Sequence, residues 1–197
     1  MSVETSLRAR KKERTRRTIR LEAFRLFREQ GYTETTVEQI AAAAEISPST
    51  FFRYFPSKEQ LVMADDQDPV MIEALAAQPR GLHPLTAVRQ ATDAVYAAMS
   101  AEDAAFEQER QKLLYHLPEL RSAIGLEFQR SIELAAQMLA DYTGRPVDDF
   151  EVRVAAGAMV GAMLGIVTTG PVDATKVGHA LDLLQDGLPF GEPDDRP

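Results

Sequence analysis

Two short helices joined by a tight turn are predicted between Thr36 and Phe55, where the sequence reads TVEQIAAAAEISPSTFFRYF. The first helix has a narrow apolar face of mainly small side chains at helical spacing, formed by Val37, Ile40, Ala41 and Ala44. The second helix begins at Ser47-Pro48, because serine accepts a hydrogen bond from the first turn and proline loses nothing at the first helical position. This arrangement is typical of a helix-turn-helix DNA-binding motif.

The ends of these helices are marked by capping residues. Thr35 precedes Glu38 by three positions and Thr36 precedes Gln39 by three, so two overlapping capping boxes are predicted at the start of the first helix. Pro56 ends the second helix, and the Ser-Lys-Glu-Gln sequence directly after it predicts that a third helix starts at once.

The second helix has an inner and an outer face. Phe51 and Phe55 are four residues apart and are expected to anchor it in the core. The opposite face, toward solvent or a ligand, is then formed by Ser49, Thr50, Arg53 and Tyr54.

A basic segment precedes the motif. A longer helix is predicted from about Thr15 to Gly31, with an apolar stripe that includes Ile19, Ala23 and Phe27. The first twenty residues contain eight Lys and Arg against two Glu, whereas the whole chain has a formal net charge of −8. The basic end is therefore suited to neutralise phosphates, while the acidic remainder limits indiscriminate binding. The basic side chains are Arg8, Arg10, Lys11, Lys12, Arg14, Arg16, Arg17 and Arg20.

Residues 12–62 resemble the DNA-binding domain of the tetracycline-repressor (TetR) family of bacterial regulators. The resemblance is carried in one register by Gly31-Tyr32, Thr36-Val37, Ile40-Ala41, Ser47, Thr50-Phe51-Phe52-Arg53-Tyr54-Phe55 and Pro56-Ser57-Lys58-Glu59. It implies a homodimeric, all-helical repressor that binds a palindromic double-stranded DNA operator. It also implies a C-terminal domain that binds a small molecule and thereby releases the operator.

The resemblance also implies which side chains face DNA. Tyr54 and Lys58 would hold phosphates. The exposed face of the second helix separately predicts that Arg53 reads a base edge. The family often has Tyr where this chain has Phe52, so a hydrogen bond from that position is not available here. The full set of expected DNA-binding residues is Arg16, Arg17, Thr36, Ser47, Ser49, Thr50, Arg53, Tyr54 and Lys58.

The rest of the chain is also predicted to be helical, so the fold class is all-α. Helices are expected near 58–77 (bent around Asp68-Pro69), 84–99, 102–116, 118–142, 147–169 and 173–187. We therefore expect a basic arm and three-helix DNA-binding domain over 1–57, a helical-bundle ligand-binding and dimerisation domain over 58–190, and a disordered tail over 191–197.

The uncharged stretch 154–170 has nearly the length of a membrane span. Its Ala and Gly content and its place among amphipathic helices favour close helix packing instead, so no membrane partner is predicted. The expected dimer interface contains Ala155, Ala158, Ala162, Gly165, Val177, Leu181 and Leu184. An ordinary buried helix explains the same spacing.

The middle helices are rich in methionine and aromatic residues, which suit an apolar ligand pocket but are also common in cores. The expected ligand-binding residues are Tyr96, Met99, Phe106, Arg110, Tyr115, Phe128, Met159 and Met163, and Met138 belongs to the same pattern. Candidates for an anionic head group are Arg110, His116, Arg121 and Arg130. The stretch SKEQLVMADDQDP resembles a subset of TetR-type regulators that respond to acyl-CoA-like ligands.

Neither catalysis nor a cofactor is predicted. The three histidines lack metal-binding spacing, and no phosphate loop or nucleophile motif is present. No cysteine is present and the N-terminus lacks a secretory pattern, so a cytoplasmic location is expected. The sequence therefore predicts a ligand-responsive dimeric transcriptional regulator, and the alternative is a helical small-molecule-binding protein or enzyme with a nonspecific polyanion-binding arm.

Overall fold

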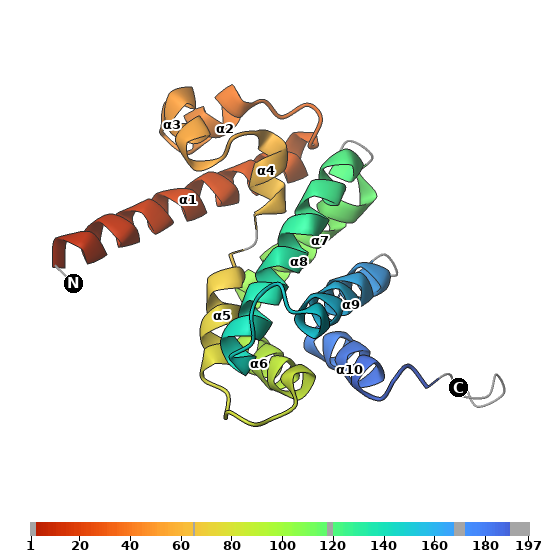
Figure 1. Ribbon diagram of the computed structural model, residues 1–197. Coiled ribbons are helices and arrows are strands. Elements are labelled where there is room, and N and C mark those ends of the chain that lie inside the picture. Colours follow the sequence, from red (N-terminus) through yellow and green to blue (C-terminus); the bar gives the residue numbers. More distant parts are fainter. Residues whose placement is uncertain (1–2, 65, 118–119, 168–171, 190–197) are drawn as a thin grey trace. The chain divides into compact units, whose positions relative to one another are not determined.

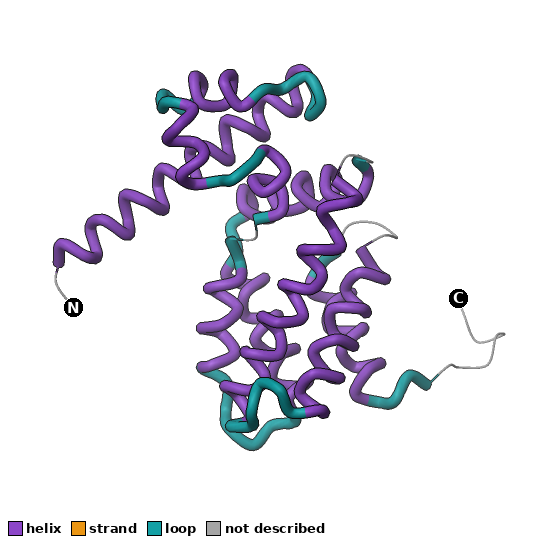
Figure 2. The backbone as a smooth tube through the Cα atoms, turned by 45° about the horizontal axis from the view of Figure 1, so that its top comes forward, coloured by secondary structure: helices purple, strands orange, loops and turns teal. Residues whose placement is uncertain are grey.

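A computed structural model describes residues 3–64, 66–117, 120–167 and 172–189, which form helices and loops without any strand (Figure 2). The all-α prediction is confirmed for these residues. The chain divides into two compact units, Met1–Ala64 and Asp65–Pro197. The tail over 191–197 lies outside the described residues.

Unit 1 (Met1–Ala64) consists of four helices (Figure 1): α1 (Val3–Gln30), α2 (Val37–Ala43), α3 (Pro48–Tyr54) and α4 (Lys58–Met63). α2 and α3 match the two predicted short helices. α1 starts at Val3, well before the expected Thr15. The added residues include Leu, Ala, Arg, Lys and Glu and no glycine or proline, so nothing in their composition stops the helix.

Aromatic side chains fill the core of unit 1. Phe24 and Phe51 are fully buried, and Phe55 is 1% exposed. The ring centroids of Phe51 and Phe55 lie 5.9 Å apart. Those of Phe27 and Tyr32 lie 5.1 Å apart. α2 packs against both α1 and α3, so the two short helices, which are too short to be stable alone, are held by tertiary contacts.

The described residues of unit 2 (Asp65–Pro197) form six helices: α5 (Asp68–Ala76), α6 (Pro84–Ala98), α7 (Ala101–His116), α8 (Arg121–Thr143), α9 (Phe150–Val167) and α10 (Ala174–Gln185). α8 packs against α5, α6, α7 and α9, while α10 packs against α6 and α9. Alanines such as Ala87, Ala91 and Ala156 are fully buried, and their small size permits close approach of the helices.

The expected single bent helix over 58–77 is instead two helices that belong to different units. α4 ends at Met63 and α5 begins at Asp68. The boundary between the units falls at Ala64/Asp65 rather than at the expected 57/58. The reason lies in Lys58, which hydrogen bonds to the loop after α1 and so attaches α4 to unit 1.

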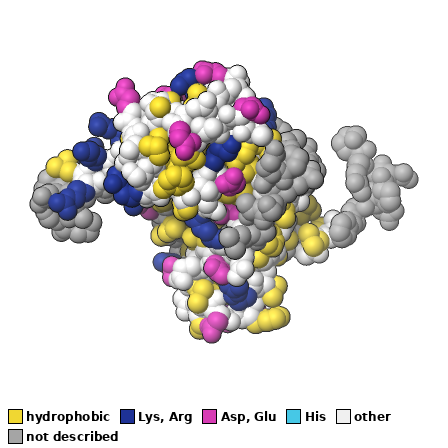
Figure 3. Space-filling view, turned by 90° about the horizontal axis from the view of Figure 1, so that it is seen from above, with side chains coloured by type: hydrophobic (Ala, Val, Ile, Leu, Met, Phe, Trp, Pro, Cys, Tyr) yellow, Lys and Arg dark blue, Asp and Glu magenta, His cyan; other side chains and the backbone are white. Residues whose placement is uncertain are grey.

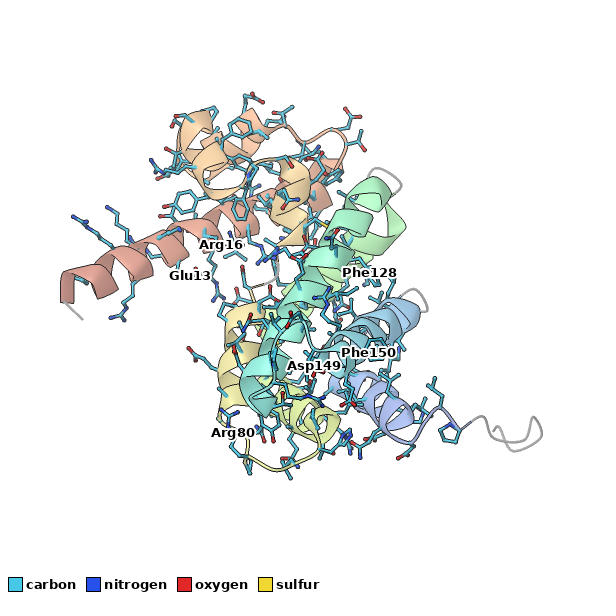
Figure 4. All side chains as sticks on the ribbon, viewed as in Figure 1. Glu13, Arg16, Arg80, Phe128, Asp149 and Phe150 are labelled. Carbon is cyan, nitrogen blue, oxygen red and sulfur yellow. The ribbon has the colours of Figure 1, made fainter. Side chains whose placement is uncertain are left out.

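A loop between α5 and α6 is fixed onto the end of α8. The hydroxyl of Tyr142 donates to the Pro79 carbonyl at 2.6 Å. Arg80, labelled in Figure 4, donates to the carbonyls of Asp141 and Tyr142. α8 then ends at Thr143, and the next residue, Gly144, has a φ of 73°, the left-handed conformation that favours glycine.

Candidate DNA interface and ligand cavity

One of the two predicted capping boxes forms at the start of α2. Thr36 Oγ1 accepts from the Gln39 backbone N–H at 3.2 Å, and Gln39 Oε1 accepts from the Thr36 N–H at 2.9 Å. The prediction of a second capping box, between Thr35 and Glu38, is wrong. Thr35 is 1% exposed and its hydroxyl donates to the Gly31 carbonyl at 2.7 Å, so it closes the loop after α1.

The turn between α2 and α3 is tight. Glu45 takes φ 55°, a left-handed conformation that is rare for a residue with a side chain. The Ile46 N–H then donates to the Ala41 carbonyl at 2.9 Å. Ser47 caps α3 by accepting from the Thr50 N–H at 3.2 Å, and its hydroxyl also contacts the hydroxyls of Ser49 and Thr50. Ser47, expected to contact DNA, is therefore occupied with shaping the start of α3.

The faces of α3 lie as the spacing predicted. Phe51 points into the core, while Ser49 and Arg53 are exposed and Thr50 and Tyr54 are partly exposed. The Arg53 guanidinium lies 5.6 Å from the centre of the Tyr54 ring. Phe52 adds an apolar surface that is 51% exposed. Thr36, at the start of α2, is exposed as well.

The basic residues before the motif lie on the regular helix α1 rather than on an extended arm. Figure 3 shows Lys and Arg side chains in dark blue along the N-terminal end of the chain. Arg17 is exposed, whereas Arg16, labelled in Figure 4, places its guanidinium 4.6 Å from the centre of the Phe55 ring. Arg16 thus connects α1 to the end of α3, and Arg17 belongs to the charged surface.

Lys58, which is expected to contact a phosphate, is partly buried and hydrogen bonds to the loop between α1 and α2. Its ammonium donates to the Tyr32 carbonyl at 2.7 Å and to the Thr35 carbonyl at 2.8 Å. It also lies 4.2 Å from the centre of the Tyr32 ring. These bonds hold the loop between α1 and α2, so the structure gives Lys58 a structural role that spacing alone does not reveal.

Unit 2 contains a cavity of about 350 Å³ that is lined by side chains from all six of its helices. Five of the chain's seven methionines line it, which gives it adaptable apolar walls. These are Met71, Met99, Met138, Met159 and Met163.

The structure brings together most of the expected ligand-binding residues. Tyr96, Met99, Arg110, Met159 and Met163 line the cavity. Phe106 is partly buried but does not line it, and the same holds for Phe128, which is labelled in Figure 4. The side chain of Tyr115 lies outside the described residues. The pattern of large apolar residues predicted which helices form the cavity. It did not predict which faces of these helices point into it.

A buried ion pair lies on the α7 side of the cavity. Arg110 Nη2 is 2.6 Å from Glu107 Oε1, and Arg110 Nε donates to Glu107 Oε2 at 2.7 Å. Gln111 donates to the same carboxylate at 3.2 Å and accepts from the Val172 N–H at 3.3 Å. Glu107 and Gln111 were not predicted, and the i, i+3 spacing of Glu107 and Arg110 was the available signal.

Two family models match the chain. The model for bacterial regulatory proteins of the tetR family matches residues 19–64, and the model for the MftR C-terminal domain matches residues 82–189. The chain belongs to the TetR family. It is therefore a DNA-binding transcriptional regulator, and its C-terminal unit is similar to the MftR C-terminal domain.

Relatives with known names agree with this assignment to the TetR family. The HTH-type transcriptional regulator TcmR of Streptomyces glaucescens is 36% identical over 76% of this chain and 61% of TcmR, so the match spans less than two thirds of that relative. The putative mycofactocin biosynthesis transcriptional regulator MftR of Mycobacterium tuberculosis is 30% identical over 84% of this chain and 87% of MftR.

A solved TetR-family structure has the same fold. NalD, the secondary repressor of the MexAB-OprM multidrug efflux pump in Pseudomonas aeruginosa, is 26% identical and superposes with a TM-score of 0.52 over 89% of this chain and 95% of NalD.

The expected dimer-interface residues of this TetR-family chain divide into two groups. Ala158 and Gly165 are exposed on α9, and Ala155, Ala162 and Leu184 are partly exposed. Val177 and Leu181 are buried in the core of their own unit and line the cavity, which removes them from any interface. Helical spacing identified α10 as amphipathic but did not show that this apolar face covers α6 and α9 of the same chain.

α9 remains largely uncovered in this TetR-family chain. It is long and apolar enough to cross a membrane by length and composition, and 17% of its residues are buried. Phe150 (Figure 4) is 80% exposed and Val154 is 53% exposed. Side chains added at Gly157, Gly161 or Gly165 would meet nothing within 4 Å, so this face has open space beside it.

Of the remaining candidates for an anionic head group, only Arg130 has a described side chain, and it does not line the cavity. Arg130 is exposed, 3.0 Å from Glu127 and 3.5 Å from Asp68. The side chains of His116 and Arg121 lie outside the described residues. Among the described residues, no group of three His, Asp or Glu side chains is placed to hold a metal ion.

Proposed function

We propose that this TetR-family regulator is a cytoplasmic homodimeric repressor that binds a palindromic operator and is released by a small, mainly apolar molecule in the unit 2 cavity. The observation that carries the proposal is the combination of an exposed reading face on α3 with a methionine-walled cavity of about 350 Å³ in the other unit. NalD is described as a repressor, which supports repression rather than activation by this protein.

On the DNA side, we assign base reading to Arg53, because Arg pairs well with guanine in the major groove and this side chain is exposed on α3. Ser49, Thr50 and Tyr54 on α3 and Thr36 at the start of α2 add hydroxyl groups suited to phosphates and sugars. Arg17 and the exposed basic residues of α1 add a sequence-independent attraction to the duplex. Phe52 offers an apolar contact to a thymine methyl in place of the hydrogen bond of a tyrosine.

We propose that the exposed apolar face of α9 is covered by α9 of a second copy rather than by lipid. Gly157, Gly161 and Gly165 recur every four residues and leave open space, which permits two helices to approach closely. Arg153 and Glu151 on the same helix are exposed, a pattern that fits a protein interface with a polar rim. A two-fold dimer also presents two α3 helices to half-sites about 34–36 Å apart.

On the ligand side, occupancy has to favour the conformer that does not bind DNA, because a ligand with equal affinity for both conformers shifts nothing. A change from 1:99 to 99:1 requires a preference of about 10⁴-fold, or about 5.5 kcal/mol. A cavity that contacts all six helices of unit 2 offers enough surface for such a difference.

The test is protection of a palindromic site near the gene for this protein, followed by release with candidate ligands. DNase I footprinting of the full chain should protect two half-sites, and screened apolar compounds should abolish protection. Ala158→Arg should give monomers that bind the operator at least about tenfold more weakly, while the matched control Ala94→Arg, on an exposed position of α6, should remain dimeric. A protein that binds all DNA alike, or that binds compounds without releasing DNA, would contradict the proposal.

A further inference from the structure

The cavity of unit 2 contains a complete ion pair within mainly apolar walls. The Arg110 side chain is 7% exposed and that of Glu107 is 16% exposed. Both carboxylate oxygens of Glu107 accept from Arg110, at 2.6 and 2.7 Å, so the pair is bidentate. The positive charge that was expected to meet an anionic ligand is therefore already neutralised.

Both residues of this pair lie on α7. A buried ion pair costs desolvation, and well-packed apolar residues of similar volume often stabilise a fold as much or more. Stability alone therefore does not require a charged pair at this place, and its position on the cavity lining puts it beside whatever the cavity holds.

The other charge on the lining is compensated as well. Asp68 lies 3.5 Å from Arg130. With Glu107 paired to Arg110, the charged side chains that line the cavity in the described part of the chain provide no surplus positive charge. Uncharged hydrogen-bonding groups on the same lining come from Thr92, Tyr96 and Gln111.

We infer that the cavity selects an uncharged, mainly apolar ligand with a hydroxyl or carbonyl end, and that Glu107 is the residue that excludes carboxylates. This inference rests on the proposed role of the cavity as the effector site. A carboxylate that approached Arg110 would have to displace Glu107, which would leave a buried carboxylate without its cation. A hydroxyl or carbonyl can bond to the amide and hydroxyl groups of the lining while the ion pair stays intact.

The experiment is calorimetric titration of the full chain, without DNA, with two matched probe pairs at pH 7.5. The pairs are 1-decanol with decanoate, and 2-naphthol with 2-naphthoate. The wild type should bind each alcohol at least about tenfold more tightly than its carboxylate. Glu107→Gln releases Arg110 from its partner and should shift the ratio toward the carboxylate by about 10- to 100-fold, the range of a charge-assisted hydrogen bond.

A second variant separates the charge effect from a folding defect. Glu107→Gln/Arg110→Met removes both charges, so the preference for alcohols should return. Glu22→Gln is the matched control, because Glu22 and Arg25 form the same i, i+3 pair on α1 and neither lines the cavity of unit 2. Met163→Trp, which fills the cavity, should weaken all four probes and so locate their binding.

Equal or tighter binding of the carboxylates by the wild type would overturn the inference, as would an unchanged ratio in Glu107→Gln. Failure of all four probes to bind would overturn both the inference and the effector site. If the alcohols bind with the expected preference but never release operator DNA, the selectivity stands and the proposed switch fails.

Discussion

The two units of this TetR-family regulator place their functional side chains in opposite ways. Unit 1 has a solid core of Phe24, Phe51 and Phe55, with at most 1% exposure, and its DNA-reading candidates lie on the surface. Unit 2 has a core interrupted by a cavity, and its ligand-binding candidates are inside. Residues that stabilise unit 1 are therefore largely separate from those proposed to act, whereas in unit 2 the same methionines serve the core and the ligand.

The nature of the two partners explains this difference. A DNA duplex is large and stiff, so it has to be met by side chains on a rigid exposed helix. A small apolar ligand gains affinity when most of its surface is enclosed. Unit 2, which encloses its ligand, consequently has less close packing to stabilise it. Unit 1, which binds its partner on the surface, can have a core packed to full density. Substitutions in each unit test this separation.

The largest expected effect is the loss of a core aromatic in unit 1. Phe51→Ala should lower the free energy of unfolding by about 3–5 kcal/mol, because the side chain is fully buried among other rings and leaves a cavity. The matched control is Phe52→Ala at the next position, which is 51% exposed and should change stability by about 0.5 kcal/mol or less. Urea unfolding followed by circular dichroism measures both. Similar losses for the two variants would contradict a solid core with a separate reading surface.

Smaller effects should distinguish a residue that reads DNA bases from a residue that stabilises the fold on the surface of unit 1. Arg53→Ala should weaken operator binding by about 1–3 kcal/mol and relax preference at one position per half-site, with unchanged thermal stability. Lys58→Met should instead lower the stability by about 1–3 kcal/mol, because two loop carbonyls lose a charged donor. Binding assays on operator and random DNA, with melting curves, decide between them. If Arg53→Ala weakened both DNAs equally, the base-reading role would fail.

Much of unit 1 could be predicted from sequence because its signals are local. Ser47 and Ser57 cap α3 and α4 through the backbone N–H three residues on, and Pro48 stands at the start of α3 as expected. Phe51 and Phe55 point inward because their spacing matches one helical face. Thr35 was misassigned because two threonines compete for one cap, and only the loop after α1 decides which of them takes it.

Non-local contacts set the limit of prediction. Lys58 looked like a surface lysine until the structure brought its ammonium to the carbonyls of Tyr32 and Thr35. Val177 and Leu181 have the spacing of an interface, yet an apolar face does not specify whether its partner is the same chain or another copy. The i, i+3 spacing of Glu107 and Arg110 could have predicted their ion pair. It could not have predicted that the pair lies beside a cavity.

A modest effect is expected from replacing a methionine that lines the cavity. Met159→Leu should cost less than about 1.5 kcal/mol in stability, because the volume is nearly conserved. It should nevertheless change probe affinity, since leucine is stiffer and branched where methionine adapts to the ligand. Met63→Leu, at a position 2% exposed in unit 1, is the matched control and should leave probe binding unchanged. Equal responses of the two variants would remove the distinction between adaptable and solid cores.

The smallest expected effects concern acid, and they compare one carboxylate from each unit. In unit 1 the pKa of Glu59 is lowered by a hydrogen bond from the Ser57 side chain, with help from Lys58. In unit 2 the pKa of Asp149 (Figure 4) is lowered first by the Val152 N–H that it caps at the start of α9, and then by Arg145. Both carboxylates are thus favoured in their charged form by the fold.

Because the folded pKa lies below the ordinary value in both cases, each carboxylate stabilises the fold above that value and ceases to do so as the pH falls through the lowered one. The window opens below 4.5 for Glu59 and below 3.8 for Asp149. Glu59→Gln and Asp149→Asn should therefore be less stable than the wild type at pH 7, with the difference shrinking as the pH falls below these values. Asp148→Asn, which removes a neighbouring exposed carboxylate, controls for net charge. Thermal melts from pH 7 to pH 3 measure these differences in stability. If Asp149→Asn had the same melting temperature as the wild type at every pH, the cap of α9 would contribute nothing to stability. The pH dependence would then come from unit 1 rather than from Asp149.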